Sequence, residues 1–266
     1  MHRFYLAPEQ WNPDALTLAG SEAHHARNVL RLQPGDKAVL FNGEGREVTG
    51  EVVALESGAV QFRKLHEAQS APLSCHITLA QAIPKGKNMD LIVQKAVEIG
   101  ASEIAPLISD RTVVKLDADD AAAKQMKWQQ VAIEAAKQCG QNWLPRVHAP
   151  QSMRDFFSLV GQSHRFPAQE NGRQSARPVN YDLRLIGSLQ SDAQHLKKIL
   201  GDFQNEHGYR PRSVLMLIGP EGDFTPAELN LARTQGCRPI TLGPIILRVE
   251  TAAIYCLSVL SYELLA

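Results

Sequence analysis

The sequence lacks an excess of either charge. Its 266 residues include 28 Lys and Arg and 28 Asp and Glu, so the formal net charge is zero. This balance argues against a protein that coats nucleic acid through bulk charge, and leaves local basic patches for such contacts. A hydrophobic fraction of 44% beside 21% charged residues predicts a packed core rather than global disorder. The length suits one large domain or two smaller ones.

Cysteine is scarce, and long apolar runs are missing. The four cysteines form no CxxC pair and no Cys/His metal spacing, which predicts reduced thiols, a cytoplasmic location and no metal: they are Cys75, Cys139, Cys237 and Cys256. The longest apolar stretch, residues 252–260, falls short of the roughly 20 residues that cross a bilayer. The N-terminus has no apolar stretch typical of a signal peptide. We therefore expect no membrane association.

The common nucleotide-binding loops are also absent. No GxxxxGK[ST] segment occurs, which excludes a phosphate loop of that type. No GxGxxG follows a strand with an acidic residue about 20 positions later, so a Rossmann dinucleotide site is disfavoured. The sequence contains no internal repeat.

Two glycine-proline turns near the C-terminus are present instead. Residues 219–223 (GPEGD) follow the apolar run 214–218, and residues 243–251 (GPIILRVET) follow the short apolar stretch 239–242. A single Gly-Pro pair is usually only a tight turn. Here each turn lies between a predicted strand and a predicted helix, where α/β proteins place ligand sites lined by backbone N–H groups. The tandem loops predict one pocket.

The rhythm of the sequence predicts two domains. Over residues 1–70, short apolar stretches at 37–41, 47–53 and 59–62 are separated by turn signals, which is typical of a small β domain, with a helix over 21–30 capped by Ser21. From residue 73 to 266, strands alternate with helices, which predicts a parallel sheet covered by helices. Predicted strands are 76–83, 103–108, 183–186 and 214–218; predicted helices are 89–99, a long helix ending near 138, 153–160, 192–203 and 250–265. Residues 161–179 read as a surface loop, and Thr225-Pro226 with Glu228 predicts a capping box.

These loops resemble the two signature loops of the RsmE family, bacterial 16S ribosomal RNA methyltransferases of the knotted SPOUT class. Further segments agree in order: residues 24–31 (HHARNVLR), 84–90 (PKGKNMD), 94–100 (QKAVEIG) and 134–141 (EAAKQCGQ). The resemblance covers nearly the whole chain. It implies a PUA-like β-barrel RNA-binding domain over residues 1–70 and an α/β domain over residues 73–266, with a parallel sheet and a deep trefoil knot.

The resemblance also implies the reaction. It is methyl transfer from S-adenosyl-L-methionine to N3 of uridine 1498 in 16S ribosomal RNA of the small ribosomal subunit. Three departures from the family pattern occur: Ile245 replaces the usual arginine, Val249 the usual threonine, and Asp223 the usual second glycine. The loss at Ile245 removes a contact to RNA or cofactor, so two alternatives stay open. One is an RNA-binding module of the same fold without catalysis, and the other is a methyltransferase that acts on another RNA site.

The cofactor in such folds is held in a bent form by three loops, largely through backbone groups and aliphatic side chains. By resemblance, the cofactor-binding residues expected here are Leu185, Ile186, Gly187, Ser188, Leu189, Ile218, Gly219, Pro220, Glu221, Gly222, Leu242, Gly243, Ile246, Leu247 and Thr251.

Arg248 and Glu250 are the candidate catalytic residues. Nitrogen N3 attacks the methyl group directly once its proton is gone, so no cysteine nucleophile is needed. Arg248 would stabilise the developing uracil anion or grip the neighbouring phosphate. Glu250 would orient Arg248 or receive the proton. An equally open interpretation is that Glu250 and Thr251 only cap a helix.

Basic residues predict the RNA contacts. At helical spacing His24, Arg27 and Arg31 share one face suited to phosphates, although a solvated surface is the ordinary interpretation of such a face. The RNA-binding residues expected are Arg3, His24, His25, Arg27, Arg31, Lys85 and Lys87. The C-terminal helix is apolar on most faces, which predicts burial in the core or in a subunit interface. The resemblance implies that two copies pair through this region, as a homodimer.

Overall fold

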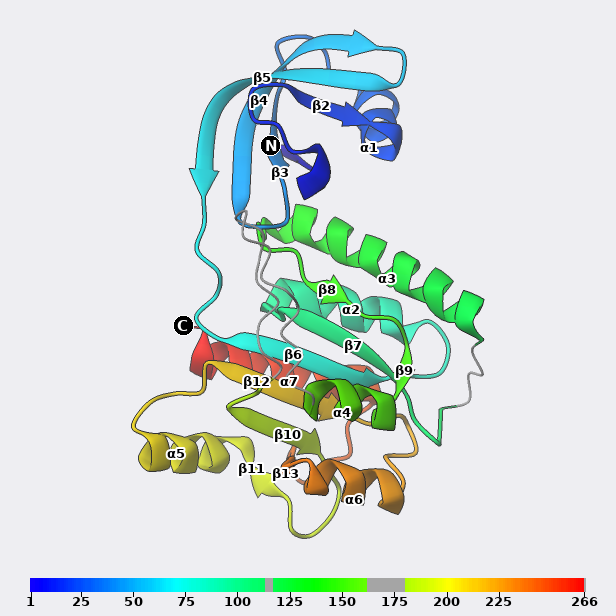
Figure 1. Cartoon of the computed structure of the whole chain (residues 1–266), viewed down its shortest axis with the longest axis vertical. Coiled ribbons are helices and arrows are strands. Elements are labelled where there is room, and N and C mark those ends of the chain that lie inside the picture. Colours follow the sequence, from blue (N-terminus) through cyan, green and yellow to red (C-terminus); the bar gives the residue numbers. More distant parts are fainter. Residues whose placement is uncertain (113–116, 162–179, 266) are drawn as a thin grey trace. The chain divides into compact units, whose positions relative to one another are not determined.

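A computed structural model describes residues 1–112, 117–161 and 180–265. By its internal contacts the chain divides into two compact units (Figure 1). Unit 1 comprises Met1–Pro72 together with Ile133–Leu144, and unit 2 comprises Leu73–Ala132 and Pro145–Ala266. The sequence-based division near residue 70 did not place the segment 133–144 with the β domain. The predicted loop 161–179 lies almost wholly outside the described residues.

Unit 1 is built on a five-stranded sheet of order β1-β3-β4-β5-β2. Strands β1 and β3 are parallel, and the other neighbours are antiparallel. The predicted strands at 37–41, 47–53 and 59–62 are confirmed, the last two in longer form, and two further strands lie before them. The elements are β1 (His2–Tyr5), η1 (Pro8–Gln10), β2 (Leu16–Ala19), α1 (Gly20–His24), η2 (His25–Val29), β3 (Lys37–Phe41), β4 (Arg46–Glu56) and β5 (Ala59–Gln69).

The predicted helix over 21–30 needs correction. The chain is helical from Gly20 to Val29, but only α1 is an α-helix, and η2 is a π-helical turn. Ser21 lies inside α1 and does not cap it, because the N-cap position is Ala19, without a side-chain hydrogen bond. Arg31 follows the helix with a φ of 54°. Spacing arguments that assume 3.6 residues per turn therefore fail beyond His24.

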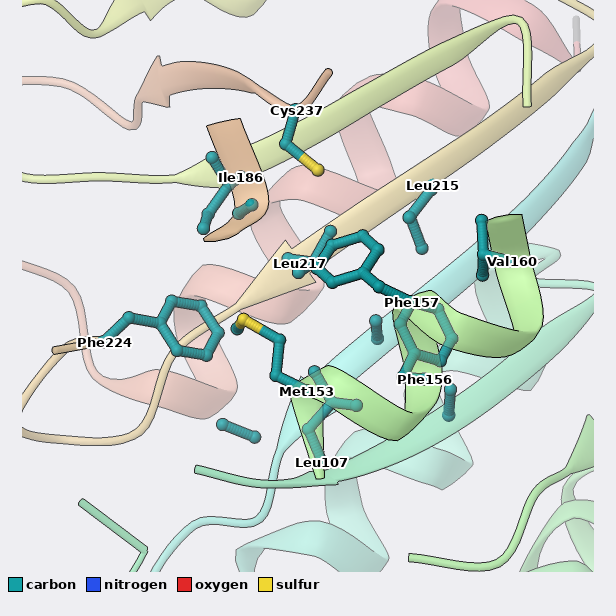
Figure 2. Close-up of a cluster of buried hydrophobic side chains, with 14 of the residues drawn as sticks. Leu107, Met153, Phe156, Phe157, Val160, Ile186, Leu215, Leu217, Phe224 and Cys237 are labelled. Atoms are coloured by element: carbon teal, nitrogen blue, oxygen red, sulfur yellow. The ribbon is translucent and has the colours of Figure 1, made fainter. Parts of the chain in front are cut away.

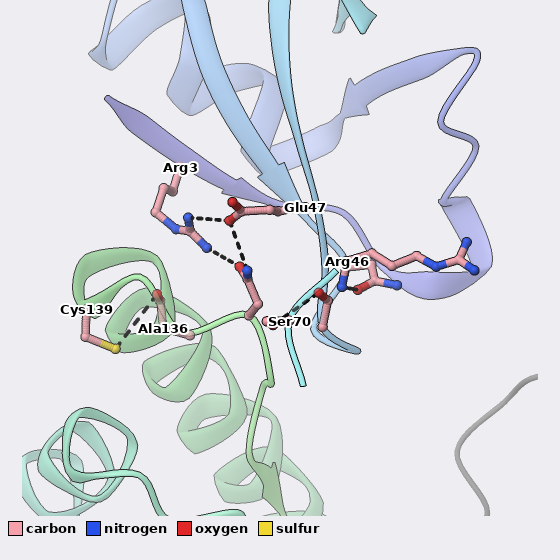
Figure 3. Close-up of polar contacts among 9 residues, drawn as sticks. Arg3, Arg46, Glu47, Ser70, Ala136 and Cys139 are labelled. Carbon is pink, nitrogen blue, oxygen red and sulfur yellow. Dashed lines mark hydrogen bonds and ion pairs between the residues drawn. The ribbon is translucent and has the colours of Figure 1, made fainter. Parts of the chain in front are cut away.

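Polar contacts fix the segment 133–144 within unit 1 (Figure 3). The Arg3 guanidinium donates to Glu47 at 3.1 Å and to the Asn142 side-chain oxygen at 2.5 Å, and Asn142 itself donates to Glu47 at 3.0 Å. Lys137, whose side chain is 8% exposed, pairs with Glu22 at 2.9 Å. A buried ammonium requires such partners. The segment therefore belongs to the folded core of this unit.

Unit 2 holds an eight-stranded parallel sheet of order β11-β13-β10-β12-β6-β7-β8, with β9 also paired to β7. This confirms the predicted α/β class with a parallel sheet. Its elements, with α3 continuing into unit 1, are β6 (His76–Ala82), α2 (Asn88–Ile99), β7 (Glu103–Ile108), α3 (Ala118–Cys139), β8 (Arg146–Val147), β9 (Gln151–Ser152), α4 (Met153–Gly161), β10 (Leu183–Gly187), β11 (Gln194–His195), α5 (Leu196–His207), β12 (Ser213–Ile218), α6 (Pro226–Thr234), β13 (Arg238–Thr241) and α7 (Val249–Leu264).

Side chains that alternate along the strands build a core on both faces of this sheet. On one face, α4 places Phe156 and Phe157 over Leu215 and Leu217 of β12, and Phe224 packs beside them (Figure 2). On the other face α7 packs against α2, β6 and β12. The residues of α7 that are buried there are Val249, Ala252, Ala253, Cys256, Leu257, Leu260 and Leu264.

Most predicted elements of unit 2 are confirmed, with two differences. Helix α5 begins at Leu196, not at residue 192. Helix α7 is not covered on all faces, because Tyr255 and Tyr262 are 47% and 77% exposed. Its apolar composition reflects one broad buried face and an exposed tyrosine-bearing face. Across the described ranges, no helix is long and apolar enough to cross a membrane.

Candidate functional site

Three loops meet at one edge of the parallel sheet. Strand β10 pairs with β12 on one side and with β13 on the other, all in the same direction. Their carboxyl ends therefore lie next to one another, and each is followed by a loop: 188–190 after β10, 219–223 after β12 and 242–247 after β13. The long sequence separation of these strands is bridged by crossover helices, so only the sheet brings the loops together.

A cavity of about 720 Å³ lies among these loops. That volume suits a nucleoside-sized ligand, since small-molecule sites usually measure about 300–1,000 Å³. Of the residues expected to bind cofactor or catalyse, those that line it are Gly187, Ser188, Leu189, Ile218, Gly219, Pro220, Glu221, Leu242, Gly243, Ile246, Leu247, Arg248 and Glu250.

Four expected residues do not line the cavity. Leu185 and Ile186 lie on β10 and are buried, at 0% and 1% exposure, so they support the loop that follows this strand without reaching the cavity. Gly222 lies just outside, where its carbonyl accepts a hydrogen bond from the Arg111 guanidinium. Thr251 is exposed on α7 and also lies outside the lining.

Other lining residues were not among the individual cofactor-binding or catalytic residues predicted, although Pro244 and Ile245 lie within a predicted loop: Asn88, Gln190, Asp223, Thr241, Pro244, Ile245, Val249 and Ala252. Most of them adjoin the predicted loops. Asn88 is different, because it comes from the crossover after β6, some 100 residues earlier in the chain than β10. Its position in the sequence could have indicated a place in the site. Asn88 follows the carboxyl end of the parallel strand β6, and β6 pairs with β12.

The first Gly-Pro loop is held by hydrogen bonds from two sides. The Glu221 carboxylate accepts from the Lys85 backbone N–H at 2.9 Å. Behind the loop, the buried Glu228 of α6 accepts from the Asp110 N–H at 3.0 Å and from the Ser109 hydroxyl at 3.2 Å. Asp223 adopts a φ of 61°, in the region that glycine favours. These contacts restrict the conformation of the loop.

Glu228 also completes the predicted capping box. The Thr225 side chain accepts from the Glu228 N–H, the Glu228 carboxylate accepts from the Thr225 N–H, and Pro226 opens the helix. This confirms the sequence prediction. The same carboxylate therefore caps α6 and fixes the segment after β7.

Arg248 and Glu250 stand at the start of α7. Arg248 is the N-cap residue, with extended backbone and an exposed side chain that caps nothing. Glu250 is half-buried and accepts a hydrogen bond from the Asn88 amide at 3.2 Å. Among the residues that the structure describes, Arg248 has no ion-pair partner, so Glu250 does not orient it here. An unpaired cation in a cavity wall is free to meet an anionic substrate.

None of the four cysteines lines the cavity. Burial raises the pKa of Cys237 and of Cys256 to about 12, so both thiols are protonated at neutral pH. Cys75 is buried and Cys139 is exposed on α3. Within the described part of the chain, no group of His, Cys, Asp and Glu is arranged to hold a metal ion.

The expected RNA contacts divide between the two units. In unit 1, His24 and Arg31 are exposed, but they do not share a helical face, because Arg31 lies beyond η2. Arg27 bonds the Glu56 carbonyl, His25 packs edge-on to Phe4 with ring centres 6.2 Å apart, and Arg3 is committed to its network with Glu47.

In unit 2, Lys85 and Lys87 are exposed on the segment before α2. Their side chains make no hydrogen bond or ion pair with any described residue.

In comparisons with known proteins, each of the two units matches a protein family. Residues 71–261 match the family described as RNA methyltransferase domain, and residues 18–65 match that described as RNA methyltransferase PUA domain. The chain is 31% identical to ribosomal RNA small subunit methyltransferase E of Synechocystis sp., over 94% of this chain and 74% of that protein. It is 30% identical to the protein of the same name from Bacillus subtilis, over 93% of this chain and 90% of that protein.

Solved structures agree. A methyltransferase from Legionella pneumophila, in complex with S-adenosylmethionine, has a TM-score of 0.80 and 31% identity, covering 98% of this chain and 97% of that one. The ribosomal RNA small subunit methyltransferase E of Neisseria gonorrhoeae, bound to S-adenosylmethionine, has a TM-score of 0.78 and 30% identity, covering 99% and 98%. Both relatives carry the cofactor that the three loops here were expected to hold.

Proposed function

The chain belongs to the ribosomal RNA small subunit methyltransferase E family, and we propose that the atom it methylates is N3 of uridine 1498 in 16S ribosomal RNA. It is an S-adenosylmethionine-dependent methyltransferase of small-subunit ribosomal RNA with an N-terminal PUA-like domain. The observation that supports cofactor-dependent methyl transfer is the cavity among the loops after β10, β12 and β13, and the target atom is proposed from the family resemblance.

The cavity fits S-adenosylmethionine by size and by lining. Leu189, Ile218 and Leu247 offer apolar contacts, while backbone groups of the glycine-containing loops offer hydrogen bonds. A Cβ added at Gly219 would meet Asp223 and Phe224 atoms at 3.3 Å, so a side chain at this position would be tightly packed and would require these neighbours to shift. When bound, the cofactor supplies a methyl group activated by a positively charged sulfur.

The protein must then position the base and manage one proton. We propose that Glu250 accepts the N3 proton of the uracil and that Arg248 stabilises the resulting negative charge. The nitrogen lone pair forms the new N–CH₃ bond as the S–CH₃ bond breaks, which leaves a neutral thioether and a methylated uridine. No covalent enzyme intermediate is required, in keeping with the protonated Cys237 and Cys256.

The RNA-binding surface is proposed in two parts. In unit 1 it comprises His24, His25, Arg27 and Arg31, and in unit 2 it comprises Lys85 and Lys87. Arg3 was expected to join it, but its internal ion pair makes it a structural residue in our proposal. Replacement of Arg31 by Glu should weaken RNA binding and reduce its salt dependence; equal salt slopes for both proteins would remove Arg31 from the surface.

We also propose a homodimer in the cytoplasm. Leu189, Ile245 and Ile246 are 66%, 74% and 77% exposed around the cavity, and Tyr255 and Tyr262 are exposed on α7. Such an exposed apolar group is typical of a protein interface. Light scattering at micromolar concentration should give twice the mass of one chain, and a monomer mass would contradict the dimer.

The trefoil knot is a further part of the proposal. It is supported by the strand order, in which β13 lies beyond β10 while α7 returns to pack on α2, β6 and β12. If the termini are joined in the folded protein, a knotted circle should remain more compact in denaturant than an unknotted circular protein of equal length. Equal hydrodynamic radii would contradict the knot.

The decisive test of function uses small ribosomal subunits that lack the mark, labelled S-adenosylmethionine and the purified protein. A methyl group on N3 blocks base pairing, so reverse transcription should stop at uridine 1498 after treatment. A stop at another nucleotide would show the same chemistry on another site. Cofactor binding without label transfer would favour an RNA-binding module and would draw attention to the change at Ile245.

A further inference from the structure

Asn88 and Glu250 meet in the cavity wall although 162 positions separate them in the chain. Asn88 is the first residue of α2 and Glu250 the second residue of α7. The Asn88 side-chain amide donates to Oε2 of Glu250 at 3.2 Å. The contact therefore fixes one oxygen of the Glu250 carboxylate in the cavity wall.

The start of α2 is itself firmly anchored. Met89 is buried, and Asp90 accepts hydrogen bonds from the Trp128 indole at 3.0 Å and from the Lys127 ammonium at 2.5 Å, both on α3. Trp128 is only 3% exposed. Asn88 therefore approaches the cavity from a backbone that α3 holds in place.

The contact with Asn88 leaves one carboxylate oxygen of Glu250 available to accept a proton. Only Oε2 is bonded, and Oε1 has no hydrogen-bond partner among the residues described here. A glutamate side chain has several rotatable bonds, and fixing one oxygen restricts where the other can lie. Precise placement matters, since a misplacement of about 1 Å can reduce a rate about a hundredfold.

We propose that Asn88 is a positioning residue, which holds the Glu250 carboxylate where it receives the substrate proton. This inference rests on the proposed function of Glu250. Asn88 was not among the residues that sequence reasoning selected, and it acts through Glu250 rather than on the substrate. The competing view is that the pair merely staples α2 to α7, which pack against each other.

Three variants separate these views. Asn88→Ala removes the donor, and we expect kcat to fall about tenfold or more while the Kd for S-adenosylmethionine and the KM for RNA change less than about twofold. Asn88→Asp places two carboxylates together and should lower kcat further. The exchanged pair, Asn88→Asp with Glu250→Gln, keeps a hydrogen bond but moves the carboxylate to the other helix.

The exchanged pair gives the sharpest result. If Asn88 and Glu250 only staple the two helices and neither takes part in catalysis, the exchanged pair should recover both Tm and kcat. A positioning role predicts that Tm returns to the wild-type value while kcat stays low, because position 250 no longer has a carboxylate. Gln94→Ala, an exposed change on the same helix, serves as the matched control and should leave kcat and Tm unchanged.

Two results would overturn the proposal: wild-type kcat in Asn88→Ala, or recovery of kcat in the exchanged pair. The rate is measured as total label transferred to RNA, wherever the methyl group lands. A failure of the uridine assignment appears separately, as a reverse-transcription stop at another nucleotide. The two proposals therefore fail by different readouts.

Discussion

At the scale of single residues, Arg248 has a proposed catalytic role, and its side chain makes no hydrogen bond or ion pair with the described residues. It is exposed, lines the cavity and does not cap α7. Its carbonyl accepts the first helical hydrogen bond, from Ala252 at 2.8 Å, and any residue can supply that carbonyl. A substitution of Arg248 should therefore leave the fold intact.

We predict that Arg248→Ala lowers kcat by about 10²–10³, the effect of removing one group that stabilises transition-state charge. Cofactor affinity by calorimetry should stay near the wild-type value. Lys197→Ala, on exposed α5 residue Lys197, is the charge-matched control. Near wild-type turnover in Arg248→Ala would remove this residue from the mechanism.

A substitution at Gly219 tests whether the cavity binds the cofactor, and does not test the catalytic step. A Cβ there would lie 3.3 Å from atoms of Asp223 and Phe224, and the residue lines the cavity wall. Gly219→Val should therefore weaken cofactor binding at least tenfold, about 1.4 kcal/mol. Gly201→Val is the control, because nothing lies within 4 Å of a Cβ at that position. Unchanged calorimetric affinity in a folded Gly219→Val protein would contradict the assignment of this loop.

At the scale of elements, the start of α6 links secondary structure to the site. Glu228 closes the capping box and holds the segment after β7 through Ser109 and Asp110. We predict that Thr225→Ala costs about 1–2 kcal/mol of unfolding free energy, the usual effect of losing an N-cap side chain. Asn230→Ala, exposed on the same helix, should cost much less. Equal denaturant midpoints for the two variants would show that the cap contributes nothing.

At the amino-terminal end of β7, away from the cavity, Glu103 contacts His76 and His148 in a way that depends on pH. Burial raises the pKa of Glu103 at the start of β7, but hydrogen bonds from His148 and His76 outweigh it and hold that pKa well below the usual range. A depressed pKa means that the stabilisation is present above the ordinary value of 4.5 and is lost as the pH falls toward the folded-state value.

Accordingly, Glu103→Gln should cost about 2 kcal/mol at pH 7, since hydrogen bonds to a charged group are lost. The difference from wild type should shrink as the pH falls below 4.5. Chemical denaturation at several pH values measures it. A difference that stays constant down to acidic pH would mean that the Glu103 charge does not stabilise the fold.

At the scale of the whole molecule, the β domain is discontinuous in sequence. Residues 133–144 belong to unit 1, where Lys137 pairs with Glu22, Asn142 binds Arg3 and Glu47, and the Trp143 indole donates to the Ser70 carbonyl at 3.1 Å. A fragment that ends at Pro72 leaves the partners of these groups without contacts.

We therefore predict that residues 1–72 alone do not fold cooperatively, and that a peptide of residues 133–144 restores structure when added or fused. Circular dichroism melts measure this, with a fusion carrying Lys137→Ala and Asn142→Ala as the control. A cooperative melt of the unaided fragment would show that the first 72 residues are a self-sufficient domain.

Much of the fold could be predicted from the sequence, because its signals are local. Apolar residues at helical spacing, closed by Gly100 with a φ of 97°, specify α2, and Thr225-Pro226 specifies the start of α6. The two Gly-Pro loops indicated the family and most of the cavity lining. The π-helical turn η2 escaped prediction, because the residues 25–29 carry the same spacing as an ordinary helix.

The sequence by itself thus determined the class of most elements, the family and the loops that line the cavity. Only the tertiary structure decided which distant segments meet: Asn88 with Glu250, Arg3 with Glu47 and Asn142, and residues 133–144 with the β domain. The physical reason is the distance along the sequence over which each kind of interaction acts. Turn chemistry and periodicity act within a few residues, whereas strand order and burial depend on contacts between segments a hundred or more residues apart, which no local pattern records.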